Sequence, residues 1–185
     1  LTAIKCEEGS MLQEIGHNAF SSPSLTKLII PNNVGSISSC CLYNTWSLTS
    51  IELLNGPRPT LQLDENKKLL YAKGTSNDEN YDYLLFAARD IRSVVIHSFV
   101  KHITSYAFEK CKKIRSFMFE KNSALNDIGY NAFSYSSIEK ITIPSSVTLI
   151  SMNAFYVCDK LKKVLFENDS KLSNITTKVF QCSGI

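Results

Sequence analysis

The side chains best suited to catalysis or metal binding are few and widely spaced in this sequence. The three histidines, His17, His97 and His102, stand at no spacing that would pair them with cysteines or carboxylates as metal ligands. The sequence contains no glycine-rich phosphate loop, Gly-x-Ser-x-Gly elbow or His-Glu-x-x-His motif, and no nucleophile has an identifiable base. We therefore expect no enzyme activity, no cofactor and no metal site.

The six cysteines could form disulfides or fill a core. Cys111 and Cys158 each follow a recurring Phe by three residues, Cys41 replaces a recurring Ala, and Cys6 ends a short apolar triplet. Free cysteine behaves as a small core hydrophobe, so these positions favour buried thiols. The alternative is a bridge between Cys158 and Cys182, which belong to neighbouring repeats, whereas Cys111 and Cys158 lie two repeats and about 10 Å apart, too far for a bond.

Two sequons could carry N-linked glycans. They begin at Asn168 (Asn-Asp-Ser) and at Asn174 (Asn-Ile-Thr), in a polar, acidic connector where a turn is expected. Both asparagines are candidate glycosylation sites if the protein is secreted.

The bulk composition is that of a globular domain and identifies no partner. The chain has 185 residues, of which 44% are hydrophobic and 20% charged, and its net charge is +3. That charge is too close to balance to indicate a nucleic-acid partner. The longest apolar runs, such as Leu84 to Ala88, are far shorter than the roughly 18 residues of a membrane span, so we expect no direct membrane insertion.

The elements that would position these side chains repeat along the chain. An apolar-x-x-apolar-x-apolar triplet occurs seven times, at Leu1/Ile4/Cys6, Leu25/Leu28/Ile30, Leu48/Ile51/Leu53, Ile91/Val94/Ile96, Ile114/Phe117/Phe119, Ile138/Ile141/Ile143 and Leu161/Val164/Phe166. Their starting positions step by 24, 23, 43, 23, 24 and 23 residues. This period predicts a leucine-rich repeat solenoid of about seven coils of 23–24 residues, with one short parallel strand per coil.

A second pattern recurs between the triplets. An Ile is followed four residues later by a small and then a large apolar residue, at Ile15/Ala19/Phe20, Ile37/Cys41/Leu42, Ile103/Ala107/Phe108, Ile128/Ala132/Phe133, Ile150/Ala154/Phe155 and Ile175/Val179/Phe180. One coil cannot bury its own apolar edge, so we expect stacked coils to share a continuous core with Phe at its centre.

The 43-residue step marks an insertion. Two apolar runs surround the charged turn in LQLDENKKLLYAK (Leu61 to Lys73), and YDYLLFAA (Tyr81 to Ala88) follows a polar loop. We predict a β-hairpin plus a third extended segment over residues 55–90, between leucine-rich repeat coils over 1–54 and 91–185. The competing interpretation is a degenerate eighth coil.

The outward face of the predicted parallel sheet is the candidate binding site. Its central column would contain Lys5, Ile29, Glu52, Val95, Met118, Thr142 and Leu165. Arg and Met are enriched at protein interfaces, and exposed apolar residues rimmed by charge mark binding patches. We predict protein-binding contacts at Ile29, Arg92, Val95, Arg115, Met118, Lys140, Lys162 and Leu165. The alternative is that these apolar residues merely suit strands while the charges keep the face soluble.

The repeat has a family resemblance. The stretch IPSSVTLISMNAFYVCDKLKKVLF (Ile143 to Phe166) resembles a unit of the BspA-like leucine-rich repeat family, and ENKKLLYAK (Glu65 to Lys73) resembles the hairpin that often interrupts its arrays. Members are typically surface or secreted proteins of bacteria and of protist parasites such as trichomonads. The resemblance implies an extracellular or cell-surface antigen that adheres to host matrix, plasma or cell-surface proteins, a role in host–pathogen interaction.

Two other functions stay open. The chain could be a structural spacer whose binding activity lies in other coils or domains, or an intracellular scaffold, which unpaired cysteines would suit. Because the repeats begin inside a strand, we expect a fragment of a longer array, with open sheet edges that could associate end to end.

Overall fold

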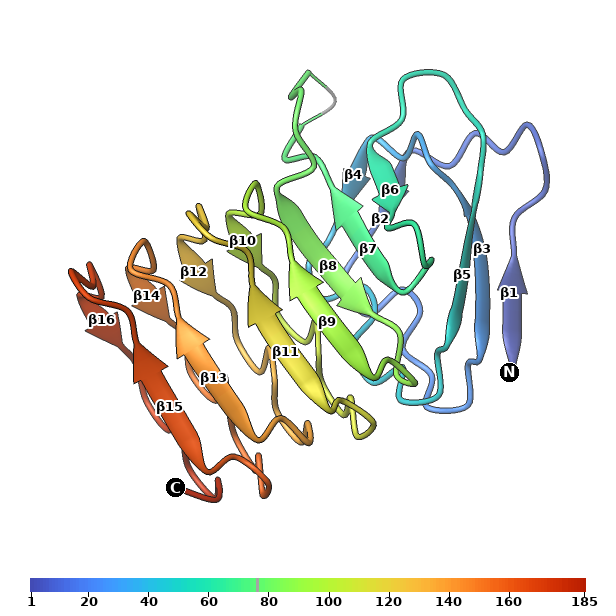
Figure 1. Cartoon of the computed structure of the whole chain (residues 1–185). Helices are drawn as coiled ribbons and strands as arrows, with labels where there is room; N and C mark the ends of the chain where they lie inside the picture. The colour runs from blue at the N-terminus through green and yellow to red at the C-terminus, as the bar shows by residue number, and fades with distance from the viewer. Residues whose placement is uncertain (76) are drawn as a thin grey trace.

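The chain forms a β-solenoid. The computed structural model describes residues 1–75 and 77–185, which contain sixteen short strands and no helix (Figure 1). Seven of these strands overlap the apolar triplets and form the front of the coils: β1 (Ala3–Lys5), β3 (Lys27–Pro31), β5 (Ser50–Leu54), β9 (Ser93–Ile96), β11 (Ser116–Phe119), β13 (Lys140–Ile143) and β15 (Lys163–Phe166). The predicted solenoid of about seven coils is therefore confirmed.

The register reproduces the sequence period. Lys27 of β3 pairs in parallel with Ser50 of β5, and Ser93 of β9 pairs in parallel with Ser116 of β11, so that equivalent residues of successive coils lie side by side. The alternating burial follows from this pairing, because β9 and β13 both point every second residue into the core and the others outward.

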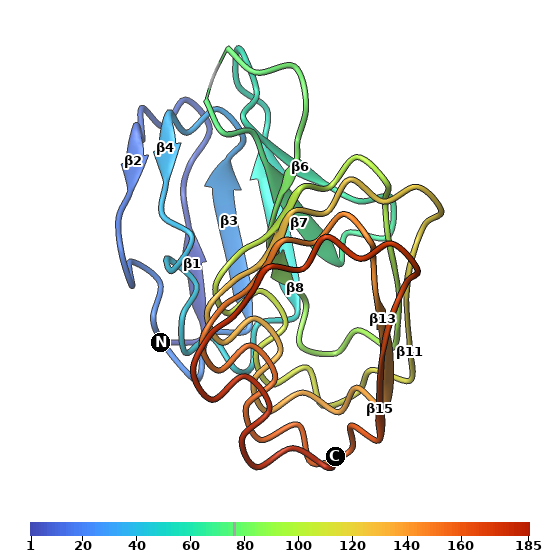
Figure 2. The same cartoon turned by 90° about the vertical axis from the view of Figure 1, so that its left-hand side faces the viewer.

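Six of the seven coils also have a second, two-residue strand on the back. These strands are β2 (Glu14–Ile15), β4 (Ser36–Ile37), β10 (His102–Ile103), β12 (Asp127–Ile128), β14 (Leu149–Ile150) and β16 (Asn174–Ile175). Each ends on the Ile of the second sequence pattern, which the sequence interpretation placed between strands rather than in one. We call the coils of residues 1–54 the first half and those of residues 91–185 the second half. In Figure 2 the front strands β11, β13 and β15 lie on one side of the second half, and its turns lie on the other.

The insertion forms a hairpin that joins the back of the solenoid. β6 (Leu61–Leu63) pairs antiparallel with β7 (Leu69–Ala72), which pairs antiparallel with β8 (Tyr83–Ala87). β8 then pairs in parallel with β10, giving the sheet order β16-β14-β12-β10-β8-β7-β6. The predicted hairpin-like insertion is confirmed. Its third segment, β8, supplies the back strand of the coil that begins with β5, and the described part of the insertion adds no front strand of an eighth coil.

The inserted sheet divides the apolar interior into two cores. Leu69 and Tyr71 of β7 pack into the core of the second half, while Leu70 and Ala72 of the same strand pack into the core of the first. This alternation is the ordinary consequence of a strand that is buried on both faces. In Figure 2 the front strands β1 and β3 stand well apart from β11, β13 and β15, so the fronts of the two halves do not form one continuous face.

The core of the second half is organised around stacked phenylalanines. The ring centroids of Phe108 and Phe133 are 4.9 Å apart, those of Phe133 and Phe155 5.1 Å, and those of Phe155 and Phe180 5.4 Å. Ala107, beside this column, is fully buried. The prediction of Phe at the centre of the coils, with Ala where little space remains, is confirmed for this half.

The cysteines fall into two groups. Cys41, Cys111 and Cys158 are buried, as predicted, and the Cys158 thiol lies 3.0 Å from the carbonyl oxygen of Phe133. Cys6 and Cys40 are half-buried and Cys182 is exposed, so the expectation of a buried thiol is met only in part at Cys6. All six, each in the described part of the chain, are free, including the pair Cys158 and Cys182.

Candidate binding surface

The front of the second half presents most of the predicted contact residues to solvent. Arg92, Arg115, Lys140 and Lys162 are exposed, and each lies at or just before the start of a front strand. Val95 lies in β9, three residues after Arg92, and Met118 lies in β11, three residues after Arg115. Their side chains are 42% and 55% exposed. Because these two residues are register neighbours in β9 and β11, they form an apolar centre beside a row of positive charge.

Two predicted contacts are less accessible than expected. Leu165 is half-buried in β15. Ile29 is only 7% exposed, so the prediction that it lies on an open face is wrong. It lies in β3, the middle of three paired strands, where the four consecutive residues from Leu28 to Pro31 are buried, so that this strand is buried on both faces.

A groove separates β11 from β13. The two strands are neighbours but belong to different sheets, because no ladder of backbone hydrogen bonds joins them in the described structure. The groove has a volume of about 440 Å³ and is lined by Ile114, Arg115, Ser116, Phe117, Met118, Ile138, Glu139, Lys140 and Thr142. Three of the predicted contacts, Arg115, Met118 and Lys140, therefore meet in one concavity, which we call the front-face groove.

The floor of the front-face groove is held by aromatic packing. Phe117 points inward from β11 and packs edge-to-face against Phe108 at 5.4 Å and against Phe133 at 5.1 Å. Val94 and Ile141 occupy the corresponding inward positions on β9 and β13. Phe117 therefore brings a larger ring to this level of the core than its neighbours on β9 and β13 do.

A second groove lies between β9 and the turn of the inserted hairpin. It has a volume of about 510 Å³, and Arg92, Ser93, Val95 and His97 line one wall while Asp64, Glu65 and Lys68 line the other. Two further predicted contacts, Arg92 and Val95, belong to this hairpin groove, so the predicted set does not form one uniform patch. Lys162, Leu165 and Ile29 line neither groove.

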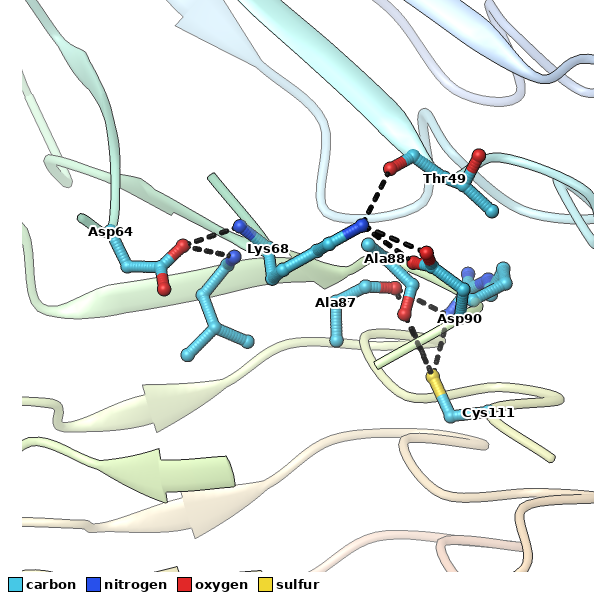
Figure 3. A network of polar contacts seen from close by, with 9 residues as sticks. Thr49, Asp64, Lys68, Ala87, Ala88, Asp90 and Cys111 are labelled. Atoms are coloured by element: carbon cyan, nitrogen blue, oxygen red, sulfur yellow. Dashed lines mark hydrogen bonds and ion pairs between the residues drawn. The ribbon is translucent and has the colours of Figure 1, made fainter. Parts of the chain in front are cut away.

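Polar contacts hold the hairpin turn in place (Figure 3). The Asp64 carboxylate accepts hydrogen bonds from the backbone N–H groups of Lys68 and Leu69, both at 2.6 Å. The Lys68 ammonium donates to both oxygens of Asp90, at 2.8 and 2.9 Å, and to the carbonyl of Thr49 at 3.3 Å. Through Thr49, Lys68 connects the hairpin to the start of β5, and through Asp90 it connects the hairpin to the segment that precedes β9.

A buried arginine joins the same two halves. The Arg89 guanidinium donates to the carbonyls of Thr45 at 3.3 Å and Ala107 at 3.0 Å, and it lies 4.3 Å above the ring of Phe86. Nearby, Glu109 is only 5% exposed, and its Oε2 has no hydrogen-bond partner. Burial raises the pKa of Glu109, although the charge of Arg89 opposes this shift.

Sequence reasoning missed an aromatic surface on the back turns. The rings of Tyr43 and Tyr106 lie 4.7 Å apart and those of Tyr106 and Tyr130 5.4 Å apart. Trp46 is 41% exposed, with the Lys110 ammonium 3.1 Å above its ring. The signal was present, because Tyr106 and Tyr130 come one and two residues before the recurring Ala of their coils.

The histidines and the sequons are accessible but build no centre. His17 is exposed and hydrogen-bonds Ser38, His97 contacts Glu120 at 3.0 Å, and His102 contacts Asp127 at 2.6 Å. Within residues 1–75 and 77–185, no three His, Cys, Asp or Glu side chains gather as metal ligands, and no helix could span a membrane. Asn168 and Asn174 are both exposed, the latter at the start of β16.

The architecture defines a leucine-rich repeat solenoid, and the comparison with known families is more specific. A model described as the BspA type leucine-rich repeat region matches residues 1–61 and 81–185 in six copies. This chain belongs to the BspA-type leucine-rich repeat family. No curated protein gives a significant match to the sequence.

Solved structures share the fold. A leucine-rich cell surface protein from Faecalibacterium prausnitzii aligns over 95% of this chain and 64% of its own, with 15% identity and a TM-score of 0.54. The pneumococcal vaccine antigen PcpA aligns over 99% of this chain and 35% of its own, with 21% identity and a TM-score of 0.49. The chain therefore spans less than two thirds of either protein, and at these identities the likeness concerns the fold alone.

Proposed function

We propose that this chain is the binding segment of a cell-surface or secreted protein and that it holds a protein partner on the front of its second half. The partner we expect is a host matrix, plasma or cell-surface protein. The observation that carries the proposal is the front-face groove, where Arg115, Met118 and Lys140 surround one concavity and Met118 is 55% exposed. A large exposed apolar side chain within a basic rim is characteristic of protein interfaces.

The surroundings of the groove favour a macromolecule over a small ligand. The groove opens on a face that continues over Val95 on one side and over Lys162 on the other, and all of these residues are exposed. The excess of Arg and Lys over Glu139 would attract an acidic epitope and accelerate its association at low salt. Arg92, Val95, Lys162 and Leu165 would then provide peripheral contacts, and Ile29, which is buried in the other half, would provide none.

The surface location rests on the family and on one neighbour. The protein from Faecalibacterium prausnitzii is a leucine-rich cell surface protein, and we extend that location to this chain. Antibodies raised against residues 1–185 should therefore label intact, unpermeabilised cells of the source organism. Glycans on Asn168 or Asn174 of the native protein would support secretion independently.

A matched pair of variants tests the binding face. The test variant carries Arg115→Glu and Met118→Gln in the front-face groove, and the control carries Lys171→Glu and Met11→Gln at two exposed positions outside it. Immobilised matrix and plasma proteins and host epithelial cells serve as the partner panel. We expect saturable binding by the parent and the control, with at least about tenfold weaker binding by the folded test variant.

Two outcomes would contradict the proposal. If the test variant and the control bind equally well, the site lies elsewhere on the molecule. If neither the parent nor the control binds any member of the panel while both are folded, the spacer function is favoured, with the activity in coils outside this chain.

A further inference from the structure

We infer that the hairpin groove is a second binding site, which accepts an extended peptide segment of a partner protein as a strand added to the open edge of β9. The segment should carry a basic side chain. This site is separate from the front-face groove, and the inference does not depend on the function proposed above.

The edge of β9 is open because the insertion interrupts the front sheet. In the other coils of each half the front strands follow one another at the period of the repeat, but residues 55–75 and 77–90 contribute β8 to the back ladder and no strand to the front. β5 therefore ends one sheet, and β9, which pairs only with β11 in the described structure, begins another (Figure 1).

The backbone groups that face the groove can be assigned from the ladder. The N–H groups of Ser116 and Glu120 donate to the carbonyls of Arg92, just before β9, and of Ile96, at its end, so the even-numbered residues of this segment pair with β11. In a parallel pair the alternate residues direct their N–H and C=O groups to the other side. Ser93 and Val95 therefore present both backbone groups to the hairpin groove, and such an unpaired edge is a template for a further strand.

The groove is large enough and already formed. Its volume of about 510 Å³ lies within the range of about 300–1,000 Å³ that is usual for ligand sites. The opposite wall is held by the Asp64 bonds to the backbone of the hairpin turn and by the Lys68–Asp90 ion pair at 2.8 Å (Figure 3). The same Lys68 ammonium also donates to the Thr49 carbonyl at 3.3 Å, which anchors this wall to the residue that precedes β5.

The charges of the hairpin wall indicate the chemistry of the segment. The Lys68 ammonium is neutralised by Asp90. The Asp64 carboxylate is bonded to backbone N–H groups, and Glu65 is exposed with no ion pair among the described residues. Among the described lining residues without an ion pair, the two carboxylates of Asp64 and Glu65 outnumber the one cation, Arg92 on the opposite wall, which favours a Lys or Arg side chain on the added strand.

A proline at Val95 tests the edge directly. Its N–H group faces the groove and takes no part in the ladder with β11, so Val95→Pro removes an edge donor from a strand position where proline is tolerated. Val95→Thr serves as the folded control that keeps the donor. The probes are fluorescein-labelled peptides acetyl-Thr-X-Thr-Lys-Thr-X-Thr-amide, with X as Val, Ile, Tyr or Phe, titrated with the whole chain by fluorescence anisotropy.

We expect at least one probe to bind saturably to the parent and to Val95→Thr, and at least about tenfold more weakly to Val95→Pro. Glu65→Lys and replacement of the probe lysine by glutamate should each weaken binding, whereas the Arg115→Glu, Met118→Gln variant should bind the probe like the parent. If this variant still binds the probe, the hairpin groove is tested independently of the front-face groove, and either proposal can be wrong without the other.

Several results would overturn the inference. No saturable binding of any probe below about 1 mM, or equal binding by Val95→Pro with circular dichroism showing that it is folded, would exclude strand addition at this edge. Equal affinity for probes methylated on the backbone nitrogens would do the same. A parent that sediments as a dimer, with Val95→Pro monomeric, would assign the edge to a second copy of this chain instead.

Discussion

At the scale of single residues, the stacked phenylalanines carry the core of the second half. Phe133 is fully buried between Phe108 and Phe155. We expect Phe133→Ala to lower the free energy of unfolding by about 3–5 kcal/mol, because it removes the ring and leaves a cavity between two coils. Urea denaturation measures this change. Phe166→Ala, at an exposed aromatic of β15, is the control and should cost less than about 1 kcal/mol; equal losses would show that the column is not the main support.

The cysteines should differ in reactivity because they differ in burial. Burial raises the pKa of Cys41 to about 12 and of Cys158 to about 11, so neither forms a thiolate near neutral pH. We expect a thiol reagent such as Ellman's reagent to label Cys182 first in the native protein and to reach Cys41, Cys111 and Cys158 only after denaturation. Peptide mass spectrometry assigns the sites, and rapid native labelling of Cys158 would contradict the described core.

Glu109 makes stability depend on pH. Its pKa is raised in the folded protein by burial, so between the unfolded value near 4.5 and the higher folded value the native state binds more protons. The free energy of unfolding must therefore fall as pH rises through this window, and the loss persists at neutral pH. Glu109→Gln should remove this part of the pH dependence. The free energy of unfolding of the variant, relative to that of the parent, should therefore be higher at pH 7 than at pH 4. Parallel urea titrations of the two proteins test it; identical pH profiles would exclude the buried carboxyl as the cause.

At the scale of elements, the hairpin turn depends on one carboxylate. The Asp64 side chain satisfies the backbone N–H groups of Lys68 and Leu69 at 2.6 Å. We expect Asp64→Ala to lower the free energy of unfolding by about 1–3 kcal/mol, because both donors lose their acceptor. Glu65→Ala, one residue away and exposed, should change it by less than about 0.5 kcal/mol. Comparable thermal and urea midpoints for the two variants would contradict this role of Asp64.

The elements show what the sequence could and could not predict. The front strands and buried rings were predictable, because a period of 23–24 residues places the same side-chain type at the same point of every coil. The place of β8 in the back ladder was harder to see. Leu84 pairs with Ile103 and precedes Ala88 by four residues, as Ile103 precedes Ala107, but a Leu replaces the recurring Ile.

The candidate site was only partly predictable. Arg115, Met118 and Lys140 could be assigned to the outward face by alternation along each strand. Their gathering around a groove depends on the interrupted ladder between β11 and β13, which no repeat pattern encodes. The burial of Ile29 likewise could not be predicted by alternation, because four consecutive residues of β3 are buried in the stacked coils.

At the scale of the whole molecule, the insertion separates two short solenoids, and its strands β7 and β8 contribute side chains to both cores. Lys68 and Arg89 link the halves, and each half has its own core. In the second half, the front strands and the turns, which include Tyr106 and Tyr130, lie on opposite sides of the same coils (Figure 2), so a partner that contacts one side leaves the other free. This opposition allows a single experiment to distinguish them.

The most direct test is a hydrogen–deuterium exchange footprint of the chain with the partner that the binding panel identifies. We predict slower exchange in residues 114–119 and 138–143, which border the front-face groove, and unchanged exchange in the back turns at 104–106 and 128–130. Protection confined to those back turns, with Tyr106 and Tyr130, would contradict the central claim and place the binding surface on the aromatic side of the solenoid.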